Sequence, residues 1–150
     1  MLYLEYEKLR EAQRLTIDRY EEVLEEQEML FAKTQPQGVD YGGDKVQASP
    51  TSTTAERYVE AMERARIDER KAELILTIRE REELLKFKKT ALYASKWPED
   101  TIYRMRILEG AKVPEIARKA HYSRQHTYRI LRRILEEIRK MRQNETTAGV

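Results

Sequence analysis

The 150-residue sequence has no cysteine, only five glycines, four prolines and two phenylalanines, and no long uninterrupted apolar run. Without cysteine, the chain can form no disulfide, no thiolate metal site and no cysteine nucleophile. Glutamate occurs throughout residues 1–30, which is not the pattern of a signal peptide or a membrane span. We therefore expect a cytoplasmic protein that does not associate with a membrane.

Charge is what the sequence has in abundance. Charged residues make up 37% of the chain, and its mean hydropathy is −0.82. So much charge with so few aromatic residues cannot line a large globular core, and the abundance of Glu, Arg, Lys, Leu and Ala is typical of long helices, so we expect an all-α fold. Residues 1–33 hold 5 basic and 9 acidic side chains, whereas residues 98–143 hold 12 and 6. The basic C-terminal part indicates a polyanionic partner.

Two segments without glycine or proline, residues 2–33 and 55–96, predict two long helices. The intervening residues 34–54 are rich in Gly, Pro, Ser and Thr and predict a mobile loop. Residues 1–97 are thus expected to form a helical hairpin or a coiled coil, and the pattern equally allows pairing within one chain or between two chains. The positions expected to be buried in the first helix are Leu2, Tyr6, Leu9, Gln13, Thr16, Tyr20, Val23, Gln27 and Leu30. Those in the second are Tyr58, Met62, Ala65, Ala72, Leu74, Ile75, Ile78, Leu85 and Leu92.

Residues 98–142 predict a unit of three shorter helices. Pro98 suits the first turn of the first helix, Gly110 ends that helix, and Pro114 begins the second, which runs to about Ala120. Ser123 can cap the third helix, which runs to about residue 141. We expect residues 143–150 to form a flexible tail. The expected core positions are Ile102, Met105, Ile107, Leu108, Ile116, Ala117, Thr127, Leu131, Ile134, Leu135 and Ile138.

Two short helices joined by a tight polar connection to a longer basic helix are the sequence shape of a helix-turn-helix. The second helix of such a motif enters the major groove with its first turns, where Arg can bond guanine and Gln can bond adenine. The residues in that place, predicted to read bases, are Arg124, Gln125, His126 and Arg129. Neighbouring residues predicted to contact phosphates, which position the protein without specifying sequence, are Lys112, Arg118, Lys119, His121, Ser123, Tyr128, Arg132 and Arg133.

The segments 108–110, 113–117 and 122–130, which read Leu-Glu-Gly, Val-Pro-Glu-Ile-Ala and Tyr-Ser-Arg-Gln-His-Thr-Tyr-Arg-Ile, resemble the C-terminal helix-turn-helix of sigma factors, region 4. Within that superfamily they are most similar to phage and prophage late-gene regulators of the ArpU and RinA type. The resemblance covers about residues 98–140 and implies a transcriptional activator that binds double-stranded DNA in a bacterial host and contacts host RNA polymerase. Val113 stands where the family often has a capping Ser or Thr, and Thr127 stands where it usually has an aliphatic residue.

Two other functions fit the same sequence. A small terminase subunit also joins a helix-turn-helix to helical oligomerisation segments, although it usually places the DNA-binding part first. A protein-interaction module would use the C-terminal helices to dock on a polymerase or another regulator without touching DNA. We expect no enzyme activity, no cofactor and no metal site, because the chain shows no nucleophile–base pattern and its two histidines lack further aligned ligands. A homodimer or a higher homo-oligomer is expected.

Overall fold

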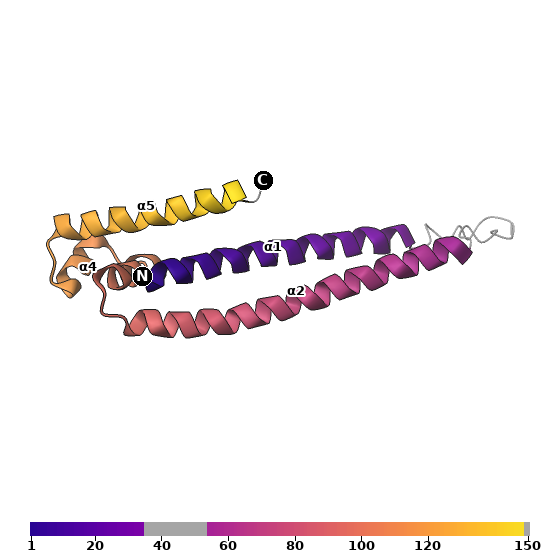
Figure 1. Cartoon of the computed structure of the whole chain (residues 1–150), viewed down its shortest axis with the longest axis horizontal. Helices are drawn as coiled ribbons and strands as arrows, with labels where there is room; N and C mark the ends of the chain where they lie inside the picture. The colour runs from indigo at the N-terminus through magenta and orange to yellow at the C-terminus, as the bar shows by residue number, and fades with distance from the viewer. Residues whose placement is uncertain (35–53, 149–150) are drawn as a thin grey trace, which may run out of the picture. The chain divides into compact units, whose positions relative to one another are not determined.

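The computed structural model describes residues 1–34 and 54–148, and this part of the chain contains helices and no strand. The elements are α1 (Leu2–Thr34), α2 (Thr54–Ala94), α3 (Pro98–Tyr103), the π-helix η1 (Arg104–Leu108), α4 (Val113–Ala120) and α5 (Arg124–Ala148), as Figure 1 shows. The prediction of an all-α fold is confirmed. The predicted loop over 34–54 lies outside the described residues, except for its end residues Thr34 and Thr54, which belong to α1 and α2.

The boundary between α2 and α3 follows from proline geometry. A residue that precedes proline disfavours the α conformation, and Trp97 has extended backbone angles of φ −67° and ψ 136°. Pro98 then occupies the first turn of α3, where its missing N–H leaves no helical bond unmade. The long helix stops at Ala94, two residues before the predicted end.

The first short helix of the C-terminal part continues into a wider turn than expected. The N–H of Glu109 donates to the carbonyl oxygen of Arg104 at 3.0 Å, which is the five-residue spacing of a π-helix. Gly110 then adopts a φ of +69°, a conformation that glycine enters without a Cβ penalty. The predicted stop at Gly110 is confirmed, and three half-buried side chains of this turn, Met105, Ile107 and Leu108, pack against the core.

The last helix is longer than predicted. α5 continues to Ala148, so the described residues of the segment that we expected to form a flexible tail, 143–148, are helical. No glycine or proline interrupts residues 124–148, and the hydroxyls of Thr146 and Thr147 donate to carbonyl oxygens one turn earlier, at 2.9 and 2.8 Å. The polar composition of the last residues was therefore not a reliable signal for where this helix ends.

The described chain forms two compact units, and their division differs from the expected domain boundary at residue 97. One unit comprises Met1–Arg14 together with the chain from Glu80 onward, and the other comprises Leu15–Arg79. We call these the end unit and the middle unit. Both long helices contribute residues to both units.

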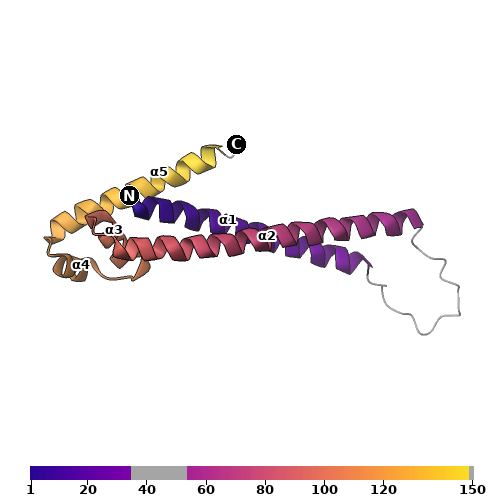
Figure 2. The same cartoon turned by 60° about the horizontal axis from the view of Figure 1, so that its bottom comes forward.

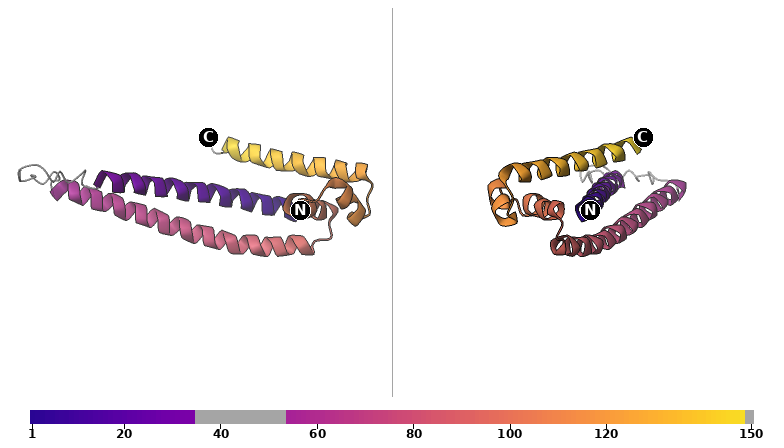
Figure 3. Two further views of the ribbon diagram at one scale, coloured as in Figure 1. Left: turned by 180° about the vertical axis from the view of Figure 1, so that it is seen from behind. Right: turned by 60° about the vertical axis from the view of Figure 1, so that its left-hand side comes forward.

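In the end unit, α3 lies beside the first turns of α1, and α4 and the start of α5 pack against α3 (Figure 2). Seen from behind, these first turns of α1 lie between α5 and the last turns of α2 (Figure 3). The buried side chains that form this core are Tyr3, Tyr6, Leu92, Ile102, Tyr103, Val113, Ile116, Ile130, Leu131, Ile134 and Ile138. α1 thus supplies part of the core on which the three shorter helices pack.

The predicted core of α5 is correct at four positions and wrong at one. Thr127, Leu131, Ile134 and Ile138 are buried, but the side chain of Leu135 is 49% exposed. A helix turns by 100° per residue, so Ile134 and Leu135 cannot both face the same partner. The prediction omitted the buried residues Ile130 and Met141 of the same helix, as well as Tyr3 of α1.

In the middle unit, α1 and α2 contact each other through a few buried apolar side chains and two polar contacts. Val23 and Ile67 are buried, Arg70 lies 2.8 Å from the Glu26 carboxylate, and Lys71 donates to Gln27 at 3.0 Å. Four positions that we predicted to be buried in α2 are instead exposed: Tyr58, Met62, Ala65 and Ala72. The α2 face that meets α1 carries Ile67 and the half-buried Leu74 and Ile78, because two apolar stripes run along this helix and α1 covers only one.

Candidate functional site

The connection between α4 and α5 is a three-residue turn whose geometry is determined by backbone hydrogen bonds. His121 has a left-handed conformation, with φ 59° and ψ 36°. The N–H of Tyr122 donates to the Ala117 carbonyl at 3.0 Å, and the N–H of His121 donates to the Arg118 carbonyl at 3.4 Å. This pair of bonds is the Schellman arrangement, which satisfies the last carbonyls of α4 and turns the chain sharply.

Ser123 caps α5, as predicted. Its Oγ accepts a hydrogen bond from the N–H of His126 at 3.1 Å, so one of the otherwise unpaired N–H groups in the first turn has a partner. The Ser123 carbonyl oxygen in turn accepts from the Thr127 hydroxyl at 3.0 Å. Thr127 is fully buried with its hydroxyl satisfied, so it occupies a packing position without an unpaired polar atom.

The four residues predicted to read bases are all exposed at the start of α5. Arg124, Gln125, His126 and Arg129 point away from the core, whereas Thr127 and Ile130 of the same turns are buried. The His126 ring meets the Tyr122 ring edge-on, with centroids 5.0 Å apart, and this contact restricts the orientation of the imidazole. The remaining three side chains extend into solvent from the first two turns.

The residues predicted to contact phosphates are exposed as well. They are Lys112, Arg118, Lys119, His121, Ser123, Tyr128, Arg132 and Arg133. Two of them already have an acidic neighbour: the amine of Lys119 lies 3.2 Å from Glu115, and the guanidinium of Arg133 lies 3.7 Å from Glu99. Residues 112–133 hold seven basic side chains and one acidic one. The resulting positive field favours an anionic partner at the surface of α4 and α5.

A buried carboxylate helps to connect the site to the rest of the end unit. Asp100 is fully buried in α3, and its two oxygens accept hydrogen bonds from the Tyr3 N–H at 3.0 Å and the Ser95 hydroxyl at 2.6 Å. Because α1 begins at Leu2, the Tyr3 N–H lies in the first turn and has no acceptor within its own helix. Asp100 therefore caps α1 from another segment of the chain.

A second buried contact joins the same two helices. The Tyr103 hydroxyl donates to the Glu7 carboxylate at 2.9 Å, and the Tyr3 and Tyr103 rings stack at 5.5 Å. Burial raises the pKa of Tyr103 well above its usual value of 10.0, and the neighbouring Glu7 charge raises it further. Sequence reasoning missed these positioning residues, because no spacing along the chain links Tyr3, Glu7, Asp100 and Tyr103.

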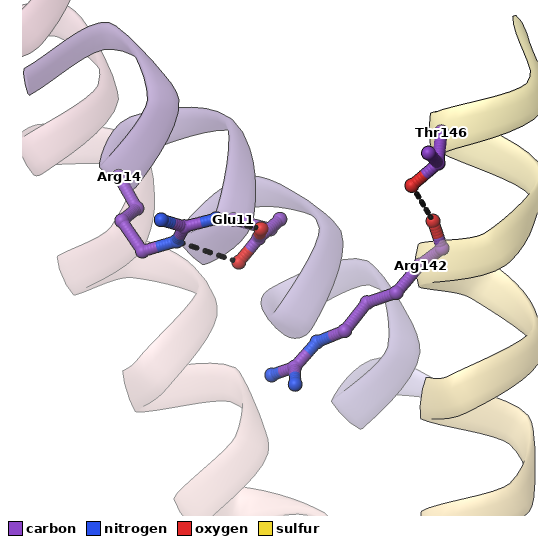
Figure 4. Close-up of polar contacts among 4 residues, drawn as sticks. All are labelled: Glu11, Arg14, Arg142 and Thr146. Atoms are coloured by element: carbon purple, nitrogen blue, oxygen red, sulfur yellow. Dashed lines mark hydrogen bonds and ion pairs between the residues drawn. The ribbon is translucent and has the colours of Figure 1, made fainter. Parts of the chain in front are cut away.

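A groove of about 800 Å³ lies between the first turns of α1 and the second half of α5. Its apolar lining comes from Ile107, Leu135 and Ile138, and its charged lining comes from Glu7, Arg10, Glu11, Arg14 and Arg142. In Figure 4 the Arg142 side chain extends from α5 toward α1, where Arg14 is paired with Glu11. The hydrogen bond from Arg14 lowers the pKa of the Glu11 carboxyl, and the charge of Arg142 acts in the same direction. The groove explains why Leu135 is exposed.

Within residues 1–34 and 54–148, no group of three or more His, Asp or Glu side chains is placed to hold a metal ion. In the same ranges, no helix has the length and apolar character that crossing a membrane requires. Comparison with protein-family models, with curated proteins and with solved structures gives no match for this chain.

Proposed function

We propose that the chain is a sequence-specific DNA-binding transcriptional regulator in which α4 and α5 act as a helix-turn-helix. The observation that carries this proposal is the start of α5. A Ser123-capped helix buries Thr127, Ile130 and Leu131 and leaves Arg124, Gln125 and Arg129 exposed. A recognition helix needs this division, because its first turns must project long polar side chains into the major groove while its other face stays on the core.

Phosphate contacts would supply much of the affinity. The exposed basic residues of α4 and α5, together with Tyr128, are suited to neutralise or bond phosphate oxygens on both sides of an inserted helix. Ser123 keeps its Oγ acceptor in the cap and can still donate its hydroxyl hydrogen to a phosphate. Arg124, Gln125, His126 and Arg129 would then contact the edges of bases.

The resemblance of residues 98–140 to sigma-factor region 4 supports a phage or prophage late-gene regulator of the ArpU and RinA type. The two departures from the family pattern have local explanations. Val113 is buried at the start of α4 and contributes to packing, while Lys112 precedes the helix without a side-chain cap. Thr127 is buried with its hydroxyl bonded to Ser123. Neither departure prevents α5 from presenting its outer face.

Selection of bound duplexes from a random pool tests the proposal directly. We expect an enriched sequence of a few base pairs, and an affinity that falls with salt because cations are released from the phosphates. The matched pair of variants is Gln125→Ala, at the predicted base-reading face, and Gln143→Ala, near the far end of the same helix. Only the first should change the enriched sequence. Absence of binding to any duplex at low salt would overturn the proposal.

The groove beside α5 favours a second candidate function, which is docking of a protein partner. Its apolar lining includes Leu135, which is 49% exposed, and its charged lining combines three arginines with Glu7 and Glu11. An amphipathic helix of RNA polymerase or of another regulator, with an acidic side chain opposite Arg142, fits that chemistry. If the chain both docks a partner and binds DNA, a Leu135→Lys substitution would abolish partner binding and leave the affinity for duplex DNA unchanged. If the chain is a pure interaction module, it would show no salt-dependent DNA binding at all.

A further inference from the structure

An exposed stripe that is apolar at five of its six positions runs along the first half of α2, within the middle unit. Tyr58, Met62, Ala65, Glu69, Ala72 and Leu76 follow one another at alternating steps of four and three residues. This is the spacing of a coiled-coil seam. The side chains of Tyr58, Met62 and Leu76 are 66%, 43% and 59% exposed, and the other three residues are exposed as well. We call these six residues the outer stripe.

The outer stripe is not the face of α2 that meets α1. Ile67 is buried and Leu74 is half-buried on the contact face. At 100° per residue, these positions lie about half a turn away from the mean direction of the outer stripe. α2 therefore carries two apolar seams on opposite sides, and within the described residues one of them has no partner.

We propose that the outer stripe pairs with the same stripe of a second copy of this chain, in the antiparallel direction. An antiparallel pair centred on residue 67 places Tyr58 of one chain against Leu76 of the other, and Met62 against Ala72. No residue of the stripe then lies opposite its own copy. The same register places Glu69 against Ala65, so the two copies of Glu69 lie in adjacent layers, about 6 Å apart along the helix axis, and not in the same layer. The stripe is thus self-complementary about its own midpoint.

Charges beside the stripe select this direction. Arg66 and Glu73 flank the same side of the seam, at the equivalent position of successive heptads, where side chains reach across to the partner helix. In the antiparallel register, Arg66 of each copy meets Glu73 of the other, which gives two symmetric ion pairs. Both side chains are exposed, and neither takes part in an ion pair within residues 1–34 and 54–148.

The parallel alternative brings like charges together. In a parallel pair in register, Glu69 would face Glu69 across the seam, and Asp68 would face Glu73 at its edge. Like charges in these positions oppose association. The antiparallel register also brings the two copies of Asp68 together beside its midpoint, so two ion pairs are set against one like-charge contact. The parallel pair has only like-charge contacts at Asp68, Glu69 and Glu73, so the balance of charge favours the antiparallel direction. The interface is independent of whether α5 binds DNA.

Disulfide trapping can determine which residues of the two chains lie opposite each other. Because the chain has no native cysteine, every disulfide formed comes from the introduced residues. A full-length Met62→Cys chain is mixed with an Ala72→Cys chain that carries a mass-distinguishable tag, and the mixture is oxidised mildly. We expect the mixed disulfide to dominate, because the two Met62 positions of an antiparallel pair lie about 15 Å apart along the helix. The control replaces Met62→Cys by Glu63→Cys, one residue away and directed off the stripe.

Three results of this trapping experiment would overturn the proposal. They are a homodisulfide of Met62→Cys in excess of the mixed product, equal yields from the Met62 and Glu63 variants, and no disulfide from any pair. The first indicates a parallel pair, the second indicates random collision, and the third indicates that the stripe does not self-associate.

Sedimentation equilibrium with charge-exchanged variants provides an independent measure. We expect the unsubstituted chain to form a dimer, and Arg66→Glu or Glu73→Arg alone to raise its dissociation constant about tenfold. The double variant Arg66→Glu/Glu73→Arg restores the pairs in reverse and should return the constant to within about twofold of the original. A monomeric unsubstituted chain, or single and double variants that behave alike, would contradict the interface.

Discussion

The N–H of Tyr3 donates a hydrogen bond of 3.0 Å to the carboxylate of Asp100, which is 97 residues away in the sequence. Both groups are buried, and the bond joins the first turn of α1 to α3 in the core that supports α5. A carboxylate at the start of a helix also interacts favourably with the positive end of the helix dipole. The first helix and the candidate DNA-binding helices are therefore coupled.

Replacing this carboxylate should destabilise the end unit. We expect Asp100→Ala to lower the free energy of unfolding by about 1–3 kcal/mol, because the Tyr3 N–H and the Ser95 hydroxyl both lose a buried acceptor. Asp100→Asn keeps one acceptor oxygen and should cost less. Urea titrations followed by circular dichroism measure both changes, and equal losses from Asp100→Ala and the exposed control Glu109→Ala would contradict the role of Asp100.

Two stacked tyrosines should respond oppositely to removal of their hydroxyls. The Tyr103 hydroxyl donates to Glu7, so Tyr103→Phe leaves a buried carboxylate with one partner fewer and should cost about 1 kcal/mol at neutral pH. The buried Tyr3 hydroxyl has no hydrogen-bond partner among the described residues. Tyr3→Phe removes that unsatisfied group and should leave stability unchanged or raise it. Thermal unfolding of the two variants, side by side, checks this difference in sign.

Stability should also fall at high pH. The pKa of Tyr103 in the folded protein is raised above 10.0, so the folded state holds this proton more tightly than the unfolded state does. The resulting stabilisation is fully present below pH 10 and is lost as the pH rises through the folded-state pKa. Tyr103→Phe should flatten the decline above pH 10 in a pH series of urea titrations. An identical decline in both proteins would show that other groups control it.

The left-handed residue between α4 and α5 allows a test that separates geometry from DNA contact. His121 has a φ of 59°, which glycine adopts without strain. His121→Gly should therefore keep or increase stability by up to about 1 kcal/mol, whereas His121→Val should decrease it. If His121 contacts a phosphate, the glycine variant will lose DNA affinity without losing stability. Equal stability of the glycine and valine variants would argue against the left-handed turn.

The two classes of predicted DNA contact should behave differently. Arg124→Ala or Gln125→Ala should relax the preference for one base pair by about 1–3 kcal/mol. Lys119→Ala should weaken binding to all duplexes alike and reduce the slope of log affinity against log salt by about one. Competition binding with single-base operator variants distinguishes the two. Identical behaviour would mean that the register of the recognition helix is different.

Local signals predicted most of the helices, but they could not predict long-range contacts. Pro98, Gly110 and Ser123 mark helix ends through backbone chemistry that acts within a few residues, and the structure places an end or a cap at each of them. The burial of Tyr3 against Tyr103 depends on residues a hundred positions apart, for which one sequence carries no signal. Periodicity also failed on α2, because it shows that an apolar stripe exists and does not show which of two stripes α1 covers.

The contribution of Tyr3 and Tyr6 to the end-unit core has a consequence for synthesis on the ribosome. Both tyrosines are made long before Ile134 and Ile138, which belong to the same core cluster. At a typical elongation rate, about 7 to 27 seconds pass before those partners are made. The core of the end unit therefore cannot close before those residues have been made, and until then the nascent chain exposes two aromatic side chains that a chaperone can bind.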